Sequence, residues 1–198
     1  MIPWPSMIPT ACGILAGGAS RRMGRNKALL PFRGKPLLRH QLDLLSPLFS
    51  EILISANDAD PYAPFKLRVV PDVFAEPCSL SGIHALLKAA TAPRVFVVAC
   101  DLPFLNPKLI RKMRDISSDF DVIVPETAEG LEPLHAIYGR SCVPAIEAAA
   151  ADGHWKISGF YGGLWVDRLD VDVTEWQVEG RSPFTNANTP DDWRHAEP

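Results

Sequence analysis

Residues 94–100, RVFVVAC, restrict the fold of this chain more than any other segment. Every residue after the arginine is apolar, and an uninterrupted apolar run of this length is typical of a strand that is buried on both faces. Such strands occur mainly in parallel sheets with helices on both sides. The run therefore predicts the centre of a covered, mainly parallel sheet.

Apolar runs and amphipathic segments alternate along the rest of the chain. Leucines recur at helical spacing in 36–49, an asparagine and a proline begin 106–117, and a glycine closes 141–153, as in amphipathic helices and their ends. This pattern predicts strands at 10–16, 51–56, 66–71, 121–126, 132–138 and 163–171, and helices at 36–49, 79–90 (with Ser79 as its cap), 106–117, 141–153 and 188–196. Strands that alternate with helices indicate an α/β fold.

Length and composition favour one domain that follows a short arm. The chain has 198 residues, which is within the usual range of a single domain. Hydrophobic residues make up 47% and charged residues 22%, a balance that argues against disorder. Residues 1–9 are rich in proline and are expected to form an arm, so that residues 10–198 form the domain.

Several features favour a cytoplasmic protein. The four cysteines, at positions 12, 78, 100 and 142, occur singly, without the close pairs that zinc and redox sites show. We interpret them as buried thiols in a reducing compartment. The first residues lack the pattern of a signal peptide, and no run of about 18 apolar residues offers a membrane span. We therefore expect no membrane contact and a cytoplasmic location.

The distribution of charge is uneven. Residues 1–42 contain seven Lys and Arg and no Asp or Glu, so all 23 acidic residues follow, and the net charge of the chain is −3. A nucleic-acid-binding domain would be basic over a whole face, which argues against nucleic acid as a partner. A cationic segment on an acidic body is better suited to a small anion.

The stretch LAGGASRRMGRNK, residues 15–27, follows the first expected strand and combines two adjacent glycines with four basic side chains. Gly17 and Gly18 would let a ligand approach the backbone amides closely, and the basic groups would add full charges. The spacing matches neither the Walker A loop nor the dinucleotide-binding G-x-G-x-x-G. Taken alone, the stretch is compatible with a phosphate site and with a solvated turn.

Asp101 lies at the end of the apolar run, at the edge of the sheet where ligands of parallel sheets bind. A carboxylate there can cap the following turn. It can also hold Mg²⁺ together with phosphate oxygens if a polyphosphate binds nearby. Because the glycine stretch ends another strand at the same edge, we interpret the two together as a candidate metal–nucleotide site.

These motifs carry a resemblance to a known family. Residues 15–27 and CDLPFL at 100–105 resemble the nucleotidyltransferase superfamily, whose signature is L-A-[GA]-G-x-[GS]-x-R-[ML]-G-x-x-K. Four further stretches, LISAND, VVPDVF, SLSGIHALL and FTNANTPDD, narrow the resemblance to the molybdenum cofactor guanylyltransferases of the MobA type, over residues 12 to about 192. The resemblance implies a three-layer α/β/α, Rossmann-like sheet of the nucleotidyltransferase type.

The resemblance also implies a reaction and its participants. GMP would pass from GTP to the terminal phosphate of molybdopterin cofactor by direct in-line attack, assisted by Mg²⁺, and pyrophosphate would leave. Proteins that deliver and accept the cofactor are further expected partners. Phosphoryl transfer is catalysed mainly by positioning and charge stabilisation, so no protein nucleophile is needed.

Individual positions match the family's functional positions. Asp101 matches the metal ligand, and Arg22 and Lys27 would offset charge on the phosphates. The nucleotide-binding positions are Leu15, Ala16, Gly17, Gly18, Lys27, Asn57, Asp72 and Asp101. Asn186 and Asn188 match active-site positions near the acceptor or the metal.

Each of the weaker assignments has a structural alternative. Asn57 could occupy a turn, Asp72 could cap one, and Asn188 could cap the last helix. His135 could be a wall residue of the acceptor site or a strand histidine with satisfied hydrogen bonds.

The sequence is also compatible with other functions. Relatives that transfer cytidylate carry LAAG where this chain has LAGG, and the missing methyl group would leave room for a purine. A cytidylyltransferase, another NTP transferase with a different phosphate acceptor, and a non-catalytic nucleotide-binding module are the alternative functions.

Overall fold

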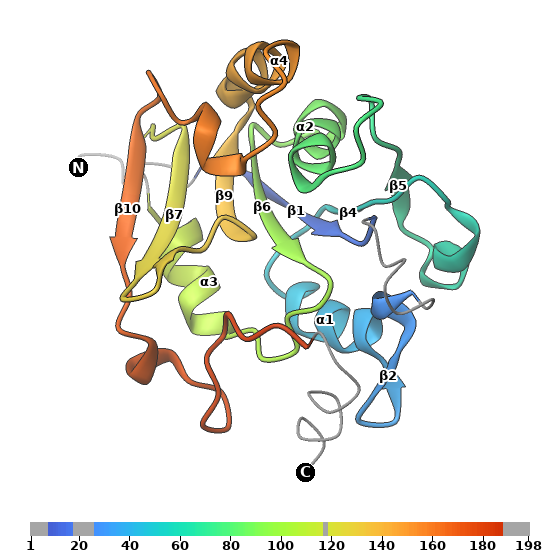
Figure 1. Ribbon diagram of the computed structural model, residues 1–198. Coiled ribbons are helices and arrows are strands. Elements are labelled where there is room, and N and C mark those ends of the chain that lie inside the picture. Colours follow the sequence, from blue (N-terminus) through green and yellow to red (C-terminus); the bar gives the residue numbers. More distant parts are fainter. Residues whose placement is uncertain (1–7, 18–25, 117–118, 188–198) are drawn as a thin grey trace, which may run out of the picture.

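The computed structural model describes residues 8–17, 26–116 and 119–187. They form a large mixed sheet between two layers of helices (Figure 1) and a separate two-stranded sheet of β2 (Pro31–Phe32) and β3 (Lys35–Pro36). The large sheet has the order β10-β7-β9-β6-β1-β4-β5, and β8 pairs with β7. Its strands are β1 (Thr10–Leu15), β4 (Ile52–Ser55), β5 (Arg68–Val70), β6 (Arg94–Ala99), β7 (Val122–Thr127), β8 (Gly130–Leu131), β9 (His135–Gly139) and β10 (Val166–Asp170).

Most of this sheet is parallel. β1 pairs in parallel with β4 and β6, and the pairs β4–β5 and β7–β10 are parallel as well. β9 is antiparallel to both of its neighbours, β6 and β7. The carboxyl ends of β1, β4, β6, β7 and β10 therefore lie at one edge of the sheet.

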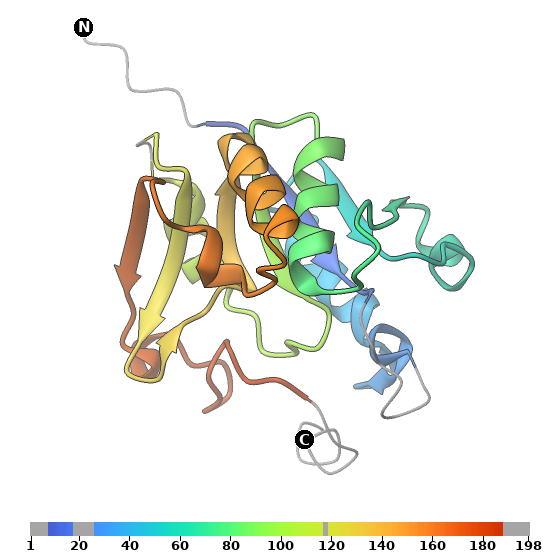
Figure 2. The same cartoon turned by 45° about the horizontal axis from the view of Figure 1, so that its top comes forward.

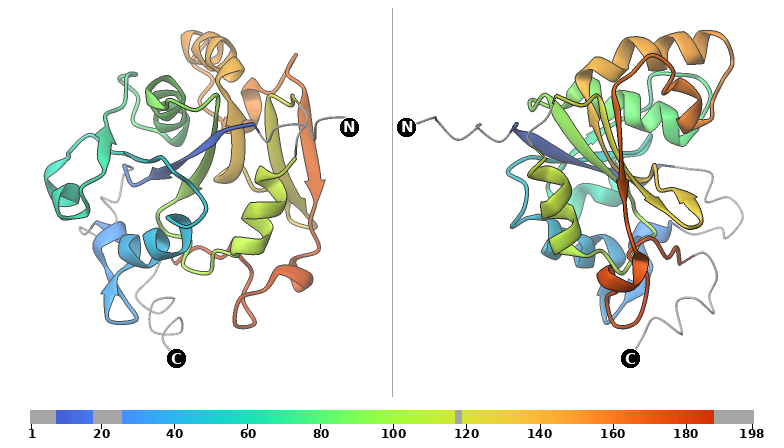
Figure 3. Two further views of the ribbon diagram at one scale, coloured as in Figure 1. Left: turned by 180° about the vertical axis from the view of Figure 1, so that it is seen from behind. Right: turned by 90° about the vertical axis from the view of Figure 1, so that its left-hand side faces the viewer.

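Helices cover both faces. α1 (Leu37–Leu45) and α3 (Pro107–Arg114) lie on one face, and α2 (Ser79–Ala89) and α4 (Val143–Ala151) lie on the other. Figure 2 shows α2 and α4 next to each other over the sheet, and Figure 3 shows α1 and α3 from behind and the layers edge-on. The three-layer α/β/α architecture predicted from the sequence is confirmed.

The central strands separate two apolar cores. Along β6, Phe96 and Val98 contribute to the core beneath α1 and α3, whereas Val95 and Val97 contribute to the core beneath α2 and α4. Every residue of β6 is buried. The prediction of a strand buried on both faces is confirmed, because both of its sides contribute apolar area to a core.

The ends of several elements differ from the predicted ranges. α1 ends at Leu45, and its C-terminal cap, Ser46, still has helical backbone angles. The next residue, Pro47, has no N–H with which to continue the helical hydrogen bonds. β9 begins at His135, after Pro133, which has no N–H to give to a sheet. The prediction that Ser79 caps α2 is wrong, because the helix already begins at Ser79 and Cys78 is the capping residue. The predicted terminal helix at 188–196 lies outside the described residues.

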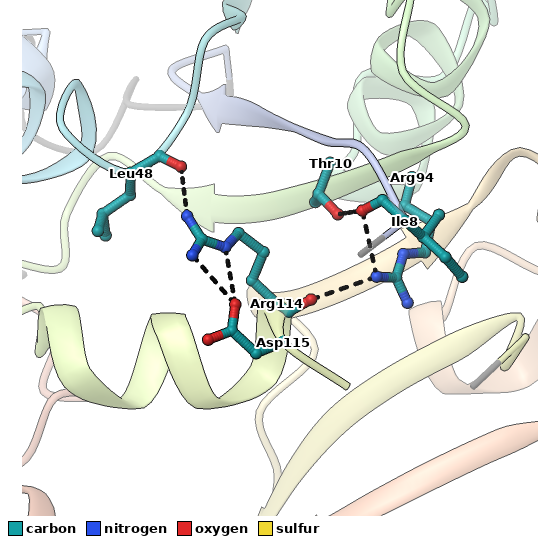
Figure 4. A network of polar contacts seen from close by, with 6 residues as sticks. All are labelled: Ile8, Thr10, Leu48, Arg94, Arg114 and Asp115. Carbon is teal, nitrogen blue, oxygen red and sulfur yellow. Dashed lines mark hydrogen bonds and ion pairs between the residues drawn. The ribbon is translucent and has the colours of Figure 1, made fainter. Parts of the chain in front are cut away.

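A polar network joins the elements at the amino end of β6, at the opposite edge of the sheet from Asp101 (Figure 4). Arg94 is 3% exposed and donates hydrogen bonds to the carbonyl oxygens of Ile116 and Arg114, at the end of α3. Arg114 donates in turn to the carbonyl of Leu48, after α1, and to the carboxylate of Asp115. The network satisfies carbonyl groups that a loop would otherwise leave without donors.

All four cysteines are free thiols, and Cys12 and Cys142 are buried. In the part of the chain that the structure describes, none of the helices has the length and apolar character needed to span a bilayer.

Candidate nucleotide site

The site lies where β1, β4 and β6 end. Ala16 and Gly17, which follow β1, both donate their backbone N–H groups to the carbonyl of Ser55, the last residue of β4. On the other side, the N–H of Cys100 donates to the carbonyl of Leu15. The N–H groups of Ala16 and Gly17 are therefore engaged within the protein. A ligand would meet the carbonyl oxygens of these residues, because each carbonyl oxygen has a second lone pair.

Close packing disfavours a residue larger than glycine at Gly17 and at Gly82. A Cβ atom on Gly17 would lie 3.1 Å from the Cα of Ala56 and 3.3 Å from the carbonyl oxygen of Ser55. A Cβ atom on Gly82, in α2, would lie 2.6 Å from both Leu15 Cδ2 and Ser55 Oγ. Gly17 is the position at which LAGG differs from LAAG. Close packing is a reason for glycine there that does not depend on which base the nucleotide carries.

Lys27 and Asp101 meet at this edge. Lys27 begins the short 3-10 helix η2 (Lys27–Leu29), and its Nζ lies 3.1 Å from Asp101 Oδ2. The two side chains are 19% and 18% exposed, so this ion pair is shielded from solvent but still accessible. The structure thus brings together the basic and acidic groups that the sequence predicted for phosphate and metal.

Two contacts fix the backbone around Asp101. Gln41 in α1 is fully buried, and its Nε2 donates to the carbonyls of Ala99 and Leu102, each at 3.0 Å. The N–H of Ala187 donates to the carbonyl of Asp101 at 2.9 Å. A side chain from α1 and a backbone group from the end of the described chain therefore hold the turn that carries the carboxylate.

The cationic segment is partly neutralised within the fold. Lys27 pairs with Asp101, Arg33 with Glu179 and Lys35 with Asp43. The guanidinium of Arg39 lies over the ring of Phe65, 5.2 Å from its centroid, in a cation–π contact. The three remaining basic residues, Arg21, Arg22 and Arg25, lie outside the described residues, as does Gly18.

Asn57 and Asp72 form a reciprocal pair. Asn57 Nδ2 donates to Asp72 Oδ2 at 3.2 Å, and the backbone N–H of Asp72 donates to Asn57 Oδ1 at 2.8 Å. Burial raises the pKa of Asp72, and the hydrogen bonds from Asn57 and Ser55 oppose that shift. The two residues are brought together at the end of β4, so the turn and cap that we considered for each alone are replaced by one shared contact.

A cavity of about 740 Å³ opens at the carboxyl ends of β7 and β10. Its walls carry carboxylates, hydroxyl groups and the ring of Phe184, and they include Glu126, Glu132, Asp170, Thr174 and Thr185. Burial raises the pKa of Glu132 to about 7, and the charge of Glu129 adds to this shift. Asn186 is exposed and directly follows this wall, whereas Asn188 lies outside the described residues.

His135 does not line the cavity. It is 1% exposed, and its ring packs edge-on against Phe96 and Phe184, so that Phe184 separates it from the cavity. Among the described residues, neither ring nitrogen has a hydrogen-bond partner on another residue. Burial lowers the pKa of His135 to about 4. The structure therefore contradicts the prediction of a strand histidine with satisfied hydrogen bonds, because the ring is enclosed by apolar neighbours. The role of a wall residue in the acceptor site stays a prediction.

Comparison with known proteins assigns the chain to a family, because a family model described as the MobA-like NTP transferase domain matches residues 12–163. The chain belongs to the MobA-like NTP transferase family. A probable molybdenum cofactor guanylyltransferase of Pelotomaculum thermopropionicum is 39% identical over 179 residues, which cover 90% of this chain and 87% of that protein. The molybdenum cofactor guanylyltransferase of Syntrophotalea carbinolica is 36% identical over 194 residues, which cover 93% and 90%.

A solved structure of the same kind confirms the fold. The molybdopterin-guanine dinucleotide biosynthesis protein A from Archaeoglobus fulgidus matches with a TM-score of 0.79 and 27% identity, over 94% of this chain and 96% of that one. The resemblance that the loop motif indicated is therefore confirmed along most of the chain. This MobA-like chain is identified as a nucleotidyltransferase.

Burial disfavours the thiolate form of the cysteine beside the site in this MobA-like fold. Cys100 precedes Asp101, and burial, with a smaller contribution from the charge of Asp101, raises its pKa to about 12. The thiol is therefore protonated at neutral pH, and thiolate is the reactive form. This agrees with a transferase whose acceptor is itself the nucleophile.

Three residues at the MobA-like site were not found by sequence reasoning: Gln41, Asn26 and Tyr62. A polar residue in the apolar stripe of α1 is a weak signal for Gln41. Asn26 and Tyr62 carry no recognisable signal, because their contacts join segments that are far apart in the chain.

Proposed function

We propose that this protein transfers GMP from GTP to the terminal phosphate of molybdopterin cofactor and releases pyrophosphate. The observation that carries the proposal is the Lys27–Asp101 pair at the carboxyl edge of β1 and β6. It lies in a chain whose relatives are named molybdenum cofactor guanylyltransferases over about nine-tenths of its length. GTP and molybdopterin cofactor are the proposed substrates.

The proposed step is a direct displacement. An oxygen of the acceptor phosphate attacks the α-phosphorus of GTP, the bond from that phosphorus to the β-bridging oxygen breaks, and pyrophosphate leaves with the electron pair. Lys27 would interact with the phosphates and offset the charge that accumulates on them. Arg22 is proposed for the same role.

Asp101 is the proposed metal ligand. Among the described residues, no group of three or more His, Cys, Asp and Glu side chains is placed to hold a metal ion. One accessible carboxylate fits a Mg²⁺ ion that arrives with the nucleotide, since Mg²⁺ is commonly held by one or two carboxylates and by phosphate oxygens. When bound, such an ion stabilises negative charge on the transferring phosphate.

The acceptor is proposed to enter from the side of the cavity. Phe184 and Thr185 belong to the cavity's wall, Asn186 follows them in the chain, and the next residue, Ala187, is hydrogen-bonded to Asp101. Its volume of about 740 Å³ is in the range of small-molecule sites. Asn186 and Asn188 are proposed to lie near the acceptor phosphate, and Asn57 and Asp72 near the nucleotide. The cytoplasmic location and the proteins that deliver or accept the cofactor stay predictions.

An assay of nucleotide use tests the function. The protein is incubated with molybdopterin cofactor, Mg²⁺ and each of the four NTPs in turn, and pyrophosphate and dinucleotide are measured. We expect product with GTP. Product with CTP instead would assign the chain to the cytidylyltransferases, and tight nucleotide binding without product would indicate a binding module.

An Asp101→Asn variant tests the assignment of the carboxylate. We expect loss of turnover of at least 100-fold with an unchanged circular dichroism spectrum, because the amide keeps the shape of the side chain but loses its charge. The matched control is Asp43→Asn, which removes an exposed carboxylate that pairs with Lys35 outside the site. Near wild-type activity of Asp101→Asn would remove Asp101 from the metal role.

A further inference from the structure

A single hydroxyl group connects the two described ends of the glycine-rich stretch. Tyr62 lies in the 3-10 helix η3 (Asp60–Phe65), between β4 and β5. Its hydroxyl donates to the carbonyl of Ala16 at 3.0 Å and accepts from Asn26 Nδ2 at 2.9 Å. Ala16 follows β1, and Asn26 immediately precedes Lys27, so this hydroxyl fixes the distance between the two positions.

Asn26 links Tyr62 to the short helix that carries Lys27. While its Nδ2 donates to Tyr62, its Oδ1 accepts from the backbone N–H of Ala28 at 3.1 Å and so caps η2. An asparagine side chain has the donor and the acceptor that these two contacts need at once. The helix held in this way carries Lys27, whose Nζ reaches Asp101.

Tyr62 is itself held firmly. It is 2% exposed and belongs to the core beneath α1 and α3. Pro61 and Pro64 stiffen η3 on either side, and the reciprocal Asn57–Asp72 pair closes the segment that contains it. Burial raises the pKa of Tyr62, so its hydroxyl keeps the proton that it donates to Ala16.

We propose that Tyr62 is a positioning residue that holds Ala16 and Asn26 at the spacing needed for nucleotide binding and thereby places Lys27 opposite Asp101. This inference rests on the proposed function, because it assigns Tyr62 to the same nucleotide site. Tyr62 acts through Asn26 and η2, and its own ring lies in the core. Without the hydroxyl, part of the binding free energy of the nucleotide would be spent on ordering these segments.

The test compares two tyrosines that differ in place but not in burial. Tyr62→Phe removes the bridging hydroxyl, and Tyr138→Phe removes an equally buried hydroxyl that donates to the carbonyl of Pro133 in the opposite core. Binding of Mg²⁺–GTP to each purified full-length variant is measured by calorimetry, well below its melting temperature.

For Tyr62→Phe we expect the Kd and the KM for GTP to rise between about 5-fold and about 30-fold, the range for losing one or two hydrogen bonds. The kcat at saturating GTP should change by less than about 3-fold, because the bound nucleotide restores the geometry. Tyr138→Phe should lower the melting temperature to a similar extent without changing the Kd.

A second variant acts at the other end of the contact. Asn26→Ser keeps an oxygen that can cap η2 but cannot reach Tyr62, and we expect it to weaken GTP binding as Tyr62→Phe does. Adding Asn26→Ser to Tyr62→Phe should change GTP binding little beyond Tyr62→Phe alone, because the hydrogen bond between the two side chains is already lost. This variant also decides the matter if Tyr62→Phe fails to fold.

The possible results separate this inference from the proposed function. A wild-type protein that does not bind Mg²⁺–GTP would overturn the proposed function. A wild-type protein that binds it, with Tyr62→Phe and Asn26→Ser within about 2-fold of its Kd, would overturn the role of Tyr62 and leave the function intact. Equal weakening by Tyr62→Phe and Tyr138→Phe would likewise reduce Tyr62 to a general contribution to stability.

Discussion

Gln41 shows how one buried amide can matter to a site that it does not line. Its Nε2 donates to the carbonyls on either side of Asp101, those of Ala99 and Leu102. The side chain is fully buried, so water cannot easily replace it as a donor. The position of the carboxylate therefore depends on a residue of α1 that precedes it by about 60 positions in the chain.

A Gln41→Met substitution should separate this positioning role from packing. Methionine has a similar volume but no donor, so two buried carbonyl groups would lose their partner. We expect kcat/KM for GTP to fall by about 10-fold or more, while the circular dichroism spectrum is retained. Steady-state kinetics provide the measurement, and a variant within 2-fold of wild type would show that the turn holds its shape without Gln41.

At the scale of elements, the start of α3 depends on one residue, Asn106. Its side-chain oxygen accepts from the N–H groups of Lys108 and Leu109, and its Nδ2 donates to the carbonyl of Trp176. Asn106 thus caps the helix that follows the Asp101 turn and attaches it to the 3-10 helix η6 (Val173–Trp176). The sequence predicted that Asn106 caps this helix, but it did not predict the hydrogen bond to Trp176.

Two substitutions at Asn106 should therefore differ in their cost. Asn106→Ala removes the cap and the link to Trp176, and we expect the free energy of unfolding to fall by about 1 to 2 kcal/mol. Asn106→Asp keeps the capping oxygen and loses only the donor, so its cost should be smaller. Urea unfolding measures both, and equal costs would mean that the cap contributes little.

The spacing of apolar residues predicted most helices and strands, because it reflects which side chains are buried. The apolar run at 94–100 indicated a strand buried on both faces, and β6 contributes to two cores. The direction of β9 could not be predicted from its residues, because an antiparallel strand in a covered sheet is as apolar as a parallel one. Element ends were displaced at prolines such as Pro47, which lacks the N–H that would continue the hydrogen bonds of α1.

The candidate site was predictable to the extent that its chemistry is local in sequence. Lys27 belongs to a motif and Asp101 ends an apolar run, so both were found before the structure brought them to 3.1 Å. Tyr62 and Gln41 act through hydrogen bonds to backbone groups of distant segments. Any residue offers a carbonyl, so such contacts leave no pattern in the sequence.

For the whole molecule, His135 and Glu132 should give the stability an unusual dependence on pH. The pKa of His135 is lowered to about 4 in the folded protein, so its contribution to stability is present above the unfolded value near 6.5 and is lost as the pH falls towards 4. The pKa of Glu132 is raised to about 7, so its contribution is present below about 4.5 and is lost as the pH rises through 7. The two groups therefore oppose each other between these limits.

Substitutions of His135 and Glu132 should reveal how each residue contributes to the pH dependence of stability. In His135→Leu, the free energy of unfolding should fall less steeply on acidification than in the wild type, by at most about 1.4 kcal/mol for each pH unit. In Glu132→Gln it should fall more steeply. Urea unfolding at pH 5, 6 and 7 gives the slopes, and slopes that are unchanged in both variants would contradict the opposing roles.

The hydrogen bond from Ala187 to the carbonyl of Asp101 has a consequence for how the protein is made. The turn that carries Asp101 is synthesised long before the segment that steadies it, and the cavity wall at 182–185 belongs to that late segment too. Contacts between positions so far apart in the chain form late, because closing a long loop costs entropy. A growing chain would thus complete most of its sheet before this hydrogen bond and this part of the cavity wall could form.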